Sequence, residues 1–109
     1  MSSIAQKIRS YREVRLRQFE SMQLGGSREK ILALYPNGQF EYVEIEQHPG
    51  PVGPPIRQSD SGTWDAEGDL PSGVLILRWA SGGATRHSFH YAGGDTCQVD
   101  GKPAYISAS

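Results

Sequence analysis

The sequence predicts an α+β protein that is mainly β: one N-terminal amphipathic helix followed by an antiparallel meander of six or seven strands, curved or barrel-like. No Gly or Pro occurs in the first 24 residues, whereas 13 Gly and seven Pro follow. This distribution of turn residues is typical of short strands joined by tight turns. With 109 residues, the chain is expected to form a single domain, with the helix over residues 1–24 and the meander over 28–107.

The N-terminal segment is predicted to be helical because its apolar residues recur at about 100° per residue. Ser2 or Ser3 would cap its first turn, and Gly25 would end it. Arg15 interrupts the apolar stripe, so we expect its stem to pack at a helix contact and its guanidinium to reach water or an acidic partner. The stripe is a candidate interface and consists of Ile4, Ile8, Tyr11, Arg15, Phe19 and Met22.

Beyond Gly25 the pattern changes to strands. Residues 28–35 and 39–48 are predicted to form a hairpin around Asn37-Gly38, because Asn-Gly supplies the positive φ angles of a tight turn. Residues 49–55 are predicted to be an irregular loop, since four of these seven residues are Pro and lack an N–H donor. Further strands are predicted over residues 58–66, 74–80, 84–91 and 96–99, with a last one through Tyr105 and Ile106.

Apolar residues lie on both faces of the predicted strands. Phe40 and Tyr42 point to one face of their strand, while Val43 and Ile45 point to the other. A sheet that is apolar on both faces must be covered on both. Closure of the sheet on itself would cover one face, and the helix, completed by a second subunit, would cover the other. We therefore expect a homodimer.

Three motifs resemble a recurrent small bacterial β-meander domain: Asn37-Gly38-Gln39-Phe40, Ser61-Gly62-Thr63-Trp64, and Val99-Asp100-Gly101 with Tyr105. The resemblance covers most of the chain after Gly25 and implies a fold and a bacterial origin, but no activity. Gly62-x-Trp64 is also similar to the motif of the first lipocalin strand, where the Trp plugs one barrel end. Here the motif lies in the middle of the chain, so the favoured interpretation is that Gly62 permits a bend and Trp64 fills the core.

Charge and composition exclude several classes of function. The net charge is −1, with five basic and two acidic residues through Leu24 and an acidic remainder. A sheet that is acidic overall argues against nucleic-acid binding. The segment from Met1 to Leu24 contains no continuous apolar stretch, so the sequence predicts neither a signal peptide nor a membrane span there. We therefore expect a cytoplasmic location.

The residues that carry chemistry form no recognisable catalytic or metal-binding pattern. His87 and His90 are three apart on one predicted strand and so lie on opposite faces, which disfavours a shared metal. Cys97 is the sole cysteine, which excludes an intramolecular disulfide and predicts a buried free thiol. We therefore predict no catalytic residues, no metal and no cofactor.

Two functional hypotheses follow. The first is a non-enzymatic interaction or assembly module that self-associates; the alternative is a β-barrel that binds a small hydrophobic ligand, which an internal cavity would favour. Glu44 and Glu46 would either flank a pocket mouth or keep an edge strand soluble, and the second reading is favoured. The candidate ligand-binding residues are Phe40, Tyr42, Trp64, Trp79, Phe89 and Tyr91.

Overall fold

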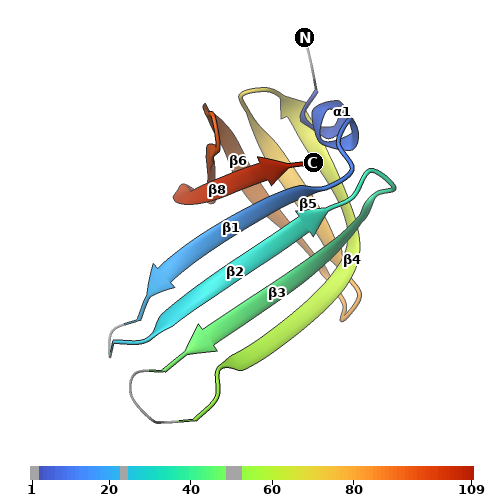
Figure 1. Cartoon of the computed structure of the whole chain (residues 1–109). Helices are drawn as coiled ribbons and strands as arrows, with labels where there is room; N and C mark the ends of the chain where they lie inside the picture. The colour runs from blue at the N-terminus through green and yellow to red at the C-terminus, as the bar shows by residue number, and fades with distance from the viewer. Residues whose placement is uncertain (1–2, 23–24, 49–52) are drawn as a thin grey trace.

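The chain folds into an eight-stranded antiparallel β-barrel, in which successive side chains of each strand point alternately into the barrel and to its outer face (Figure 1). The structure is a computed structural model that describes residues 3–22, 25–48 and 53–109. Its elements are α1 (Ile4–Arg9), β1 (Val14–Ser21), β2 (Ser27–Leu34), β3 (Gln39–Gln47), β4 (Ile56–Asp69), β5 (Ser72–Trp79), β6 (Ala84–Gly93), β7 (Thr96–Val99) and β8 (Lys102–Ala108).

The barrel closes in the order of the sequence. Each strand pairs with its neighbours along the chain, and β8 returns to pair with β1. The predictions of a mainly β protein, an antiparallel meander and a barrel-like form are therefore confirmed. Part of the predicted loop over 49–55 lies outside the described residues. Among the described residues, no helix has the length and apolar character that crossing a membrane requires.

The prediction of a helix over residues 1–24 is wrong. Only Ile4–Arg9 is helical, and it begins where the Ser3 hydroxyl accepts a hydrogen bond from the Gln6 N–H at 3.0 Å. Val14–Ser21 forms β1, which raises the number of strands to eight, against the six or seven predicted. The physical reason is pairing: β1 lies between β2 and β8 and closes the barrel.

The predicted interface stripe is consequently not formed, because its residues lie on different elements and faces. Ile4 and Ile8 are buried within the protein, with 0% and 6% of their surfaces exposed. Tyr11 packs against the core after the end of α1, whereas Phe19 lies on the outer face of β1 and is 58% exposed. Met22 follows the end of β1.

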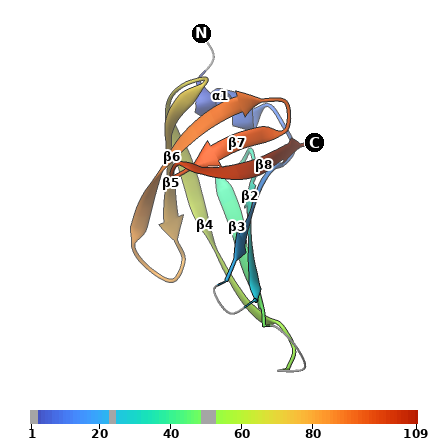
Figure 2. The same ribbon diagram turned by 90° about the vertical axis from the view of Figure 1, so that its left-hand side faces the viewer.

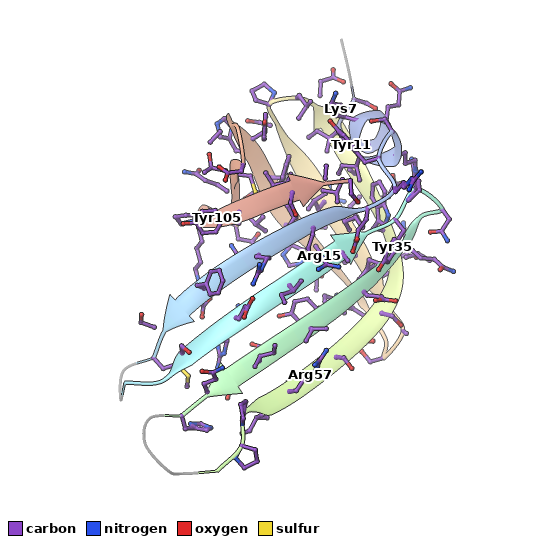
Figure 3. All side chains as sticks on the ribbon, viewed as in Figure 1. Lys7, Tyr11, Arg15, Tyr35, Arg57 and Tyr105 are labelled. Carbon is purple, nitrogen blue, oxygen red and sulfur yellow. The ribbon has the colours of Figure 1, made fainter. Side chains whose placement is uncertain are left out.

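Arg15 lies on the outer face of β1 rather than at a packed helix contact (Figure 3). Its Nη2 lies 2.7 Å from Oε1 of Glu13, and its side chain is 49% exposed. The expected acidic partner is therefore present, but it is a near neighbour in the chain and the pair is largely hydrated. Such an exposed pair contributes little to stability.

The hydrophobic core fills the end of the barrel that α1 covers (Figure 2). We call this the closed end. Its largest fully buried side chains include Phe40, Leu34 and Leu75, and Ile4 of α1 packs among them. The buried residues of this cluster are Ile4, Ile8, Val14, Leu16, Leu34, Phe40, Trp64, Leu75, Leu77, Phe89, Cys97 and Ala104.

Trp64 and Gly62 act together at the closed end. Trp64 is 2% exposed, and its indole N–H donates to the Tyr35 carbonyl oxygen at 2.7 Å. At Gly62 a Cβ would overlap the Arg78 carbonyl oxygen and approach the Phe40 ring. Trp64 therefore fills the core, as the sequence predicts. Gly62 was predicted to permit a bend, and the structure shows a different need for glycine there, the close approach of the Arg78 carbonyl and the Phe40 ring.

Strands β1 to β4 extend beyond the closed barrel at the other end (Figure 2). β8 pairs only with Val14–Arg17 of β1, and β5 pairs with β4 only from Gly62 onward. Within the described chain, residues 18–21 and 56–60 thus have a strand neighbour on one side only. We call this region, opposite α1, the open end.

Candidate ligand site at the open end of the barrel

The interior of the barrel changes from apolar to charged on passing from the closed end to the open end. Along β1 the inward side chains change from the buried Val14 and Leu16 to Gln18 and Glu20. β2 and β3 make the same change, from leucine or aromatic residues to lysine, arginine and glutamate. Inward charges are unusual in a small barrel, because interior positions are generally filled by apolar side chains.

A cavity of about 190 Å³ lies where the two regions meet. Leucines and a valine form its floor, two aromatic rings form a wall, and four polar side chains line its remaining sides. An engineered cavity of about 150 Å³ holds a benzene molecule, so this cavity accommodates one ring with a short substituent. The lining residues are Leu16, Gln18, Lys30, Leu32, Tyr42, Leu75, Leu77, Trp79, His87, Val99 and Asp100.

Tyr42 and Trp79 form the aromatic wall. Their ring centroids are 5.4 Å apart with an interplanar angle of 90°, and Phe40 packs on the other side of Trp79 with a centroid distance of 5.1 Å. Burial raises the pKa of Tyr42 to about 12, and the negative charge of Glu44 adds to this shift. Tyr42 therefore carries a neutral phenol at neutral pH.

A chain of hydrogen bonds runs along one side of the cavity. The Trp79 indole N–H donates to Thr85 Oγ1 at 2.8 Å, and Thr85 Oγ1 lies 2.8 Å from His87 Nε2. His87 Nδ1 in turn lies 2.8 Å from Asp100 Oδ2. Because a carboxylate only accepts, His87 donates from Nδ1 to Asp100, and its Nε2 shares a hydrogen bond with the Thr85 hydroxyl. The other Asp100 oxygen accepts from the Ser88 backbone N–H at 3.2 Å.

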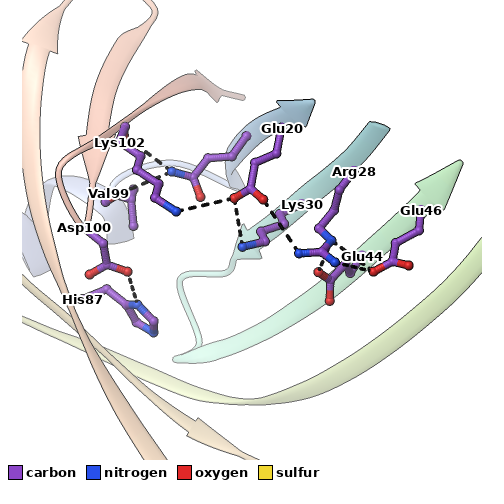
Figure 4. Close-up of polar contacts among 10 residues, drawn as sticks. Glu20, Arg28, Lys30, Glu44, Glu46, His87, Val99, Asp100 and Lys102 are labelled. Atoms are coloured by element: carbon purple, nitrogen blue, oxygen red, sulfur yellow. Dashed lines mark hydrogen bonds and ion pairs between the residues drawn. The ribbon is translucent and has the colours of Figure 1, made fainter. Parts of the chain in front are cut away.

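Glu20 is the centre of an ion-pair network at the open end (Figure 4). Its Oε1 lies 3.2 Å from Lys30 Nζ and 3.8 Å from Lys102 Nζ, and its Oε2 lies 3.8 Å from Arg28 Nη1. The hydrogen bond from Lys30 and the positive charges of these three side chains lower the pKa of Glu20. Glu20 is therefore ionised at neutral pH, and it compensates the charge of Lys30.

Arg28 extends this network across β3. Its guanidinium lies 2.6 Å from Glu46 Oε1 and 3.2 Å from Glu44 Oε1. Glu44 and Glu46 thus lie inside the open end, on the same side as Tyr42, and pair with a cation there. β3 is paired with both β2 and β4, so the favoured interpretation of an edge strand is wrong. Neither carboxylate is among the residues that line the cavity, so the pocket-mouth interpretation stays a prediction.

The aromatic residues predicted as ligand walls are divided among three environments. Tyr42 and Trp79 line the cavity at the open end. Phe89 and Tyr91 line a second cavity, of about 180 Å³, beneath α1. Phe40 and Trp64 belong to the buried core, and so does Phe89.

Four polar residues of the cavity were not predicted from the sequence: Gln18, Lys30, His87 and Asp100. Asp100 belonged to a recognised turn motif, and its φ of 55° fits an Asp-Gly hairpin turn. Its pairing with His87 depends on the alignment of β6 with β7, which no short motif specifies. Nothing in the sequence around Gln18 and Lys30 distinguishes them from ordinary surface residues.

As the sequence predicts, His87 and His90 lie on opposite faces of β6, and Cys97 is a buried free thiol. His90 faces away from His87 and pairs with Ser72, whose hydroxyl lies 2.6 Å from His90 Nδ1. Cys97 is buried, and burial raises the pKa of its thiol to about 11. In the part of the chain that the structure describes, no group of three His, Cys, Asp or Glu side chains is arranged to hold a metal ion.

Comparison with known proteins gives no match: no family model, no curated protein and no solved structure is significantly similar to this chain. The geometry of the open end is thus the basis for any assignment of function.

Proposed function

We propose that this protein binds a small organic molecule of about one ring in the cavity at the open end of the barrel. The observation that carries the proposal is the cavity itself, which combines an apolar floor, an aromatic wall and a few fixed polar groups. This combination is characteristic of small-molecule sites. Eight strands also produce an interior just wide enough for one small ligand.

Two residues that are adjacent on β2 provide a matched test. Leu32 points inward and lines the cavity, whereas Ile31 points to the outer face of the same strand. Leu32→Trp should fill the cavity, and Ile31→Trp should place the same ring outside it. The assay is a titration with one-ring compounds, neutral and charged, followed by two-dimensional ¹H–¹⁵N NMR.

We expect chemical-shift changes confined to the cavity residues in the parent and in Ile31→Trp, and their loss in Leu32→Trp. Equal responses of the two variants would refute binding in this cavity. A parent that responds to none of a broad set of one-ring compounds, neutral or charged, would refute the proposed function. Far-UV circular dichroism of both variants establishes that each is folded.

Self-association is a second candidate function, and it is supported by an aromatic pair on the outer surface. Phe19 of β1 and Tyr105 of β8 are 58% and 57% exposed, and their ring centroids are 6.4 Å apart. The guanidinium of Arg17 lies 5.5 Å from the Phe19 centroid. Exposed aromatic and arginine side chains are enriched at protein interfaces.

Light scattering at micromolar concentration tests this candidate. If the protein is a homodimer through this pair, Phe19→Ser with Tyr105→Ser should reduce the mass to that of one 12.0 kDa chain. Ile56→Ser is the control, because Ile56 is also exposed, at 47%, but lies on β4. A monomeric parent would exclude self-association under these conditions.

A further inference from the structure

The charges around the cavity indicate which class of ligand it selects. Among the described residues that line the cavity, Lys30 is the only lysine or arginine, and its Nζ lies 3.2 Å from Glu20. The surrounding network contains three cations and three carboxylates, so its formal charges balance. The members of this network are Arg28, Lys30, Lys102, Glu20, Glu44 and Glu46.

Asp100 is the carboxylate at the cavity wall that no lysine or arginine of the described residues pairs with. Its partner is His87, which donates to it from Nδ1. In the described residues, no lysine or arginine nitrogen lies within 4.0 Å of the Asp100 carboxylate. The Asp100 side chain is 50% exposed, so it remains accessible from the cavity mouth. A bound molecule with a positive charge would compensate it.

Asp60 is a second carboxylate on the inward face of the sheet, although it is not one of the residues that line the cavity. It faces Tyr42 across the β3–β4 pair, and its oxygens accept hydrogen bonds from the Ser81 hydroxyl at 2.6 Å and the Ser61 N–H at 2.7 Å. These bonds lower the pKa of Asp60, the Ser81 bond most, and keep it ionised. Asp60 and Asp100 thus add two carboxylates to a network whose formal charges balance, and this excess of negative charge favours cations over anions.

The aromatic wall formed by Tyr42 and Trp79 also favours a cationic ligand. Tyr42 and Trp79 stand perpendicular, so a ligand beside them meets the face of one ring and the edge of the other. The face of an aromatic ring attracts an ammonium group, particularly where water is partly excluded. A carboxylate ligand, by contrast, would have to displace Glu20 from Lys30 and would lie near Asp100.

We infer that the cavity selects a small organic cation, a protonated amine attached to one ring, with the ring on the leucine floor and the ammonium group directed to Asp100. This inference rests on the proposed function and specifies its ligand class. It requires no reaction, since the ligand is only bound. A matched set of three molecules isolates the charge: benzylamine, benzyl alcohol and benzoate share a ring and differ in their polar group.

The two tryptophans report on binding within one NMR spectrum. The indole N–H of Trp79 lies beside the cavity, and that of Trp64 is bonded to Tyr35 in the core. Benzylamine should shift the Trp79 signal at the lowest concentration and leave the Trp64 signal in place. Benzyl alcohol should bind more weakly, and benzoate most weakly.

Two variants that change the charge at the cavity should have opposite effects on the affinity for benzylamine. Asp100→Asn removes a negative charge and keeps a residue that tolerates the φ of 55°, so affinity should fall on the order of tenfold. Lys30→Gln removes a positive charge and should raise affinity. Benzyl alcohol is the control ligand, and its affinity should change little in either variant.

Each alternative result is distinguishable from failure of the proposed function. Tightest binding of benzoate, or equal binding of all three molecules, would overturn the cation inference while leaving ligand binding intact. Unchanged benzylamine affinity in both variants would also overturn it. If none of the three shifts Trp79, the inference fails, and the one-ring compounds of the Leu32 and Ile31 experiment decide whether the cavity binds anything.

Discussion

Trp64→Ala is the substitution for which the structure predicts the largest loss of stability. The ring is 2% exposed, and a buried Trp removes roughly 150–250 Å² from water. At about 25 cal/mol per Å² this corresponds to about 4–6 kcal/mol, which is an upper bound because the unfolded chain already buries some surface. Substitutions of buried Phe or Trp by Ala cost about 3–5 kcal/mol, and we expect a value in that range.

Trp64→Phe separates the hydrogen bond from the volume of the ring. It removes the indole N–H that bonds to the Tyr35 carbonyl but keeps an aromatic ring. That carbonyl still accepts from the Gly38 N–H at 3.1 Å, so it is not left without a donor. The expected loss is therefore smaller, about 1–2 kcal/mol.

Urea unfolding followed by far-UV circular dichroism measures both losses without relying on Trp fluorescence. Phe19→Ala is the control, because Phe19 is exposed and its removal should change the free energy of unfolding by about 0.5 kcal/mol or less. A Trp64→Ala variant within about 1 kcal/mol of the parent, at an unchanged denaturant slope, would refute the assignment of Trp64 to the core.

Three further predictions concern other parts of the barrel. Gly62→Ala should cost about 1–3 kcal/mol in urea unfolding, because its Cβ would overlap the Arg78 carbonyl oxygen; an unchanged midpoint would contradict this. The pKa of Glu20 is lowered in the folded state, so its stabilisation is present above its ordinary value of 4.5 and is lost as pH falls through the folded value. Glu20→Gln should therefore be less stable than the parent at pH 7 and approach it below pH 4, and a pH-independent difference would exclude this linkage. Cys97 is buried with a thiol pKa of about 11, so iodoacetamide at pH 8 should modify it only after unfolding, as mass spectrometry would show; rapid modification of the native protein would mean that β7 opens easily.

Turn chemistry made most of the meander predictable from the sequence. Asn37-Gly38 lies between β2 and β3, where Gly38 has the expected positive φ, of 87°, but Asn37 does not. Asp100-Gly101 joins β7 to β8, and both of its residues have positive φ angles, of 55° and 77°. The first strand was missed because its residues satisfy two periodicities. Val14 and Leu16 alternate with arginines, which fits a strand, while apolar residues spaced over the whole segment also fit a helix. Pairing with β8, whose residues follow their β1 partners by 88 to 94 positions, selects the strand.

The cavity could not be predicted because it depends on register between strands. Its polar residues come from β1, β2 and β6 and from the turn after β7, and each is an ordinary polar residue in its own segment. Lys30 is a case in point: a lysine on a strand usually faces water, and only the closure of the barrel places it inside, opposite Gln18. Local patterns identify strands, whereas the site requires knowledge of which faces turn inward.

The division of the barrel into two ends is itself an argument that the open end has a function. Stability comes from the closed end, where α1 and the apolar core are packed. Replacing a partly buried ion network by well-packed apolar residues is often neutral or stabilising, so stability alone gives no reason for Glu20, Arg28 and Lys30 to face inward. Departures from the usual apolar interior are expected where function requires them. A core at one end and an ordered set of charges beside a cavity at the other is therefore consistent with the proposed binding of a small organic molecule at the open end.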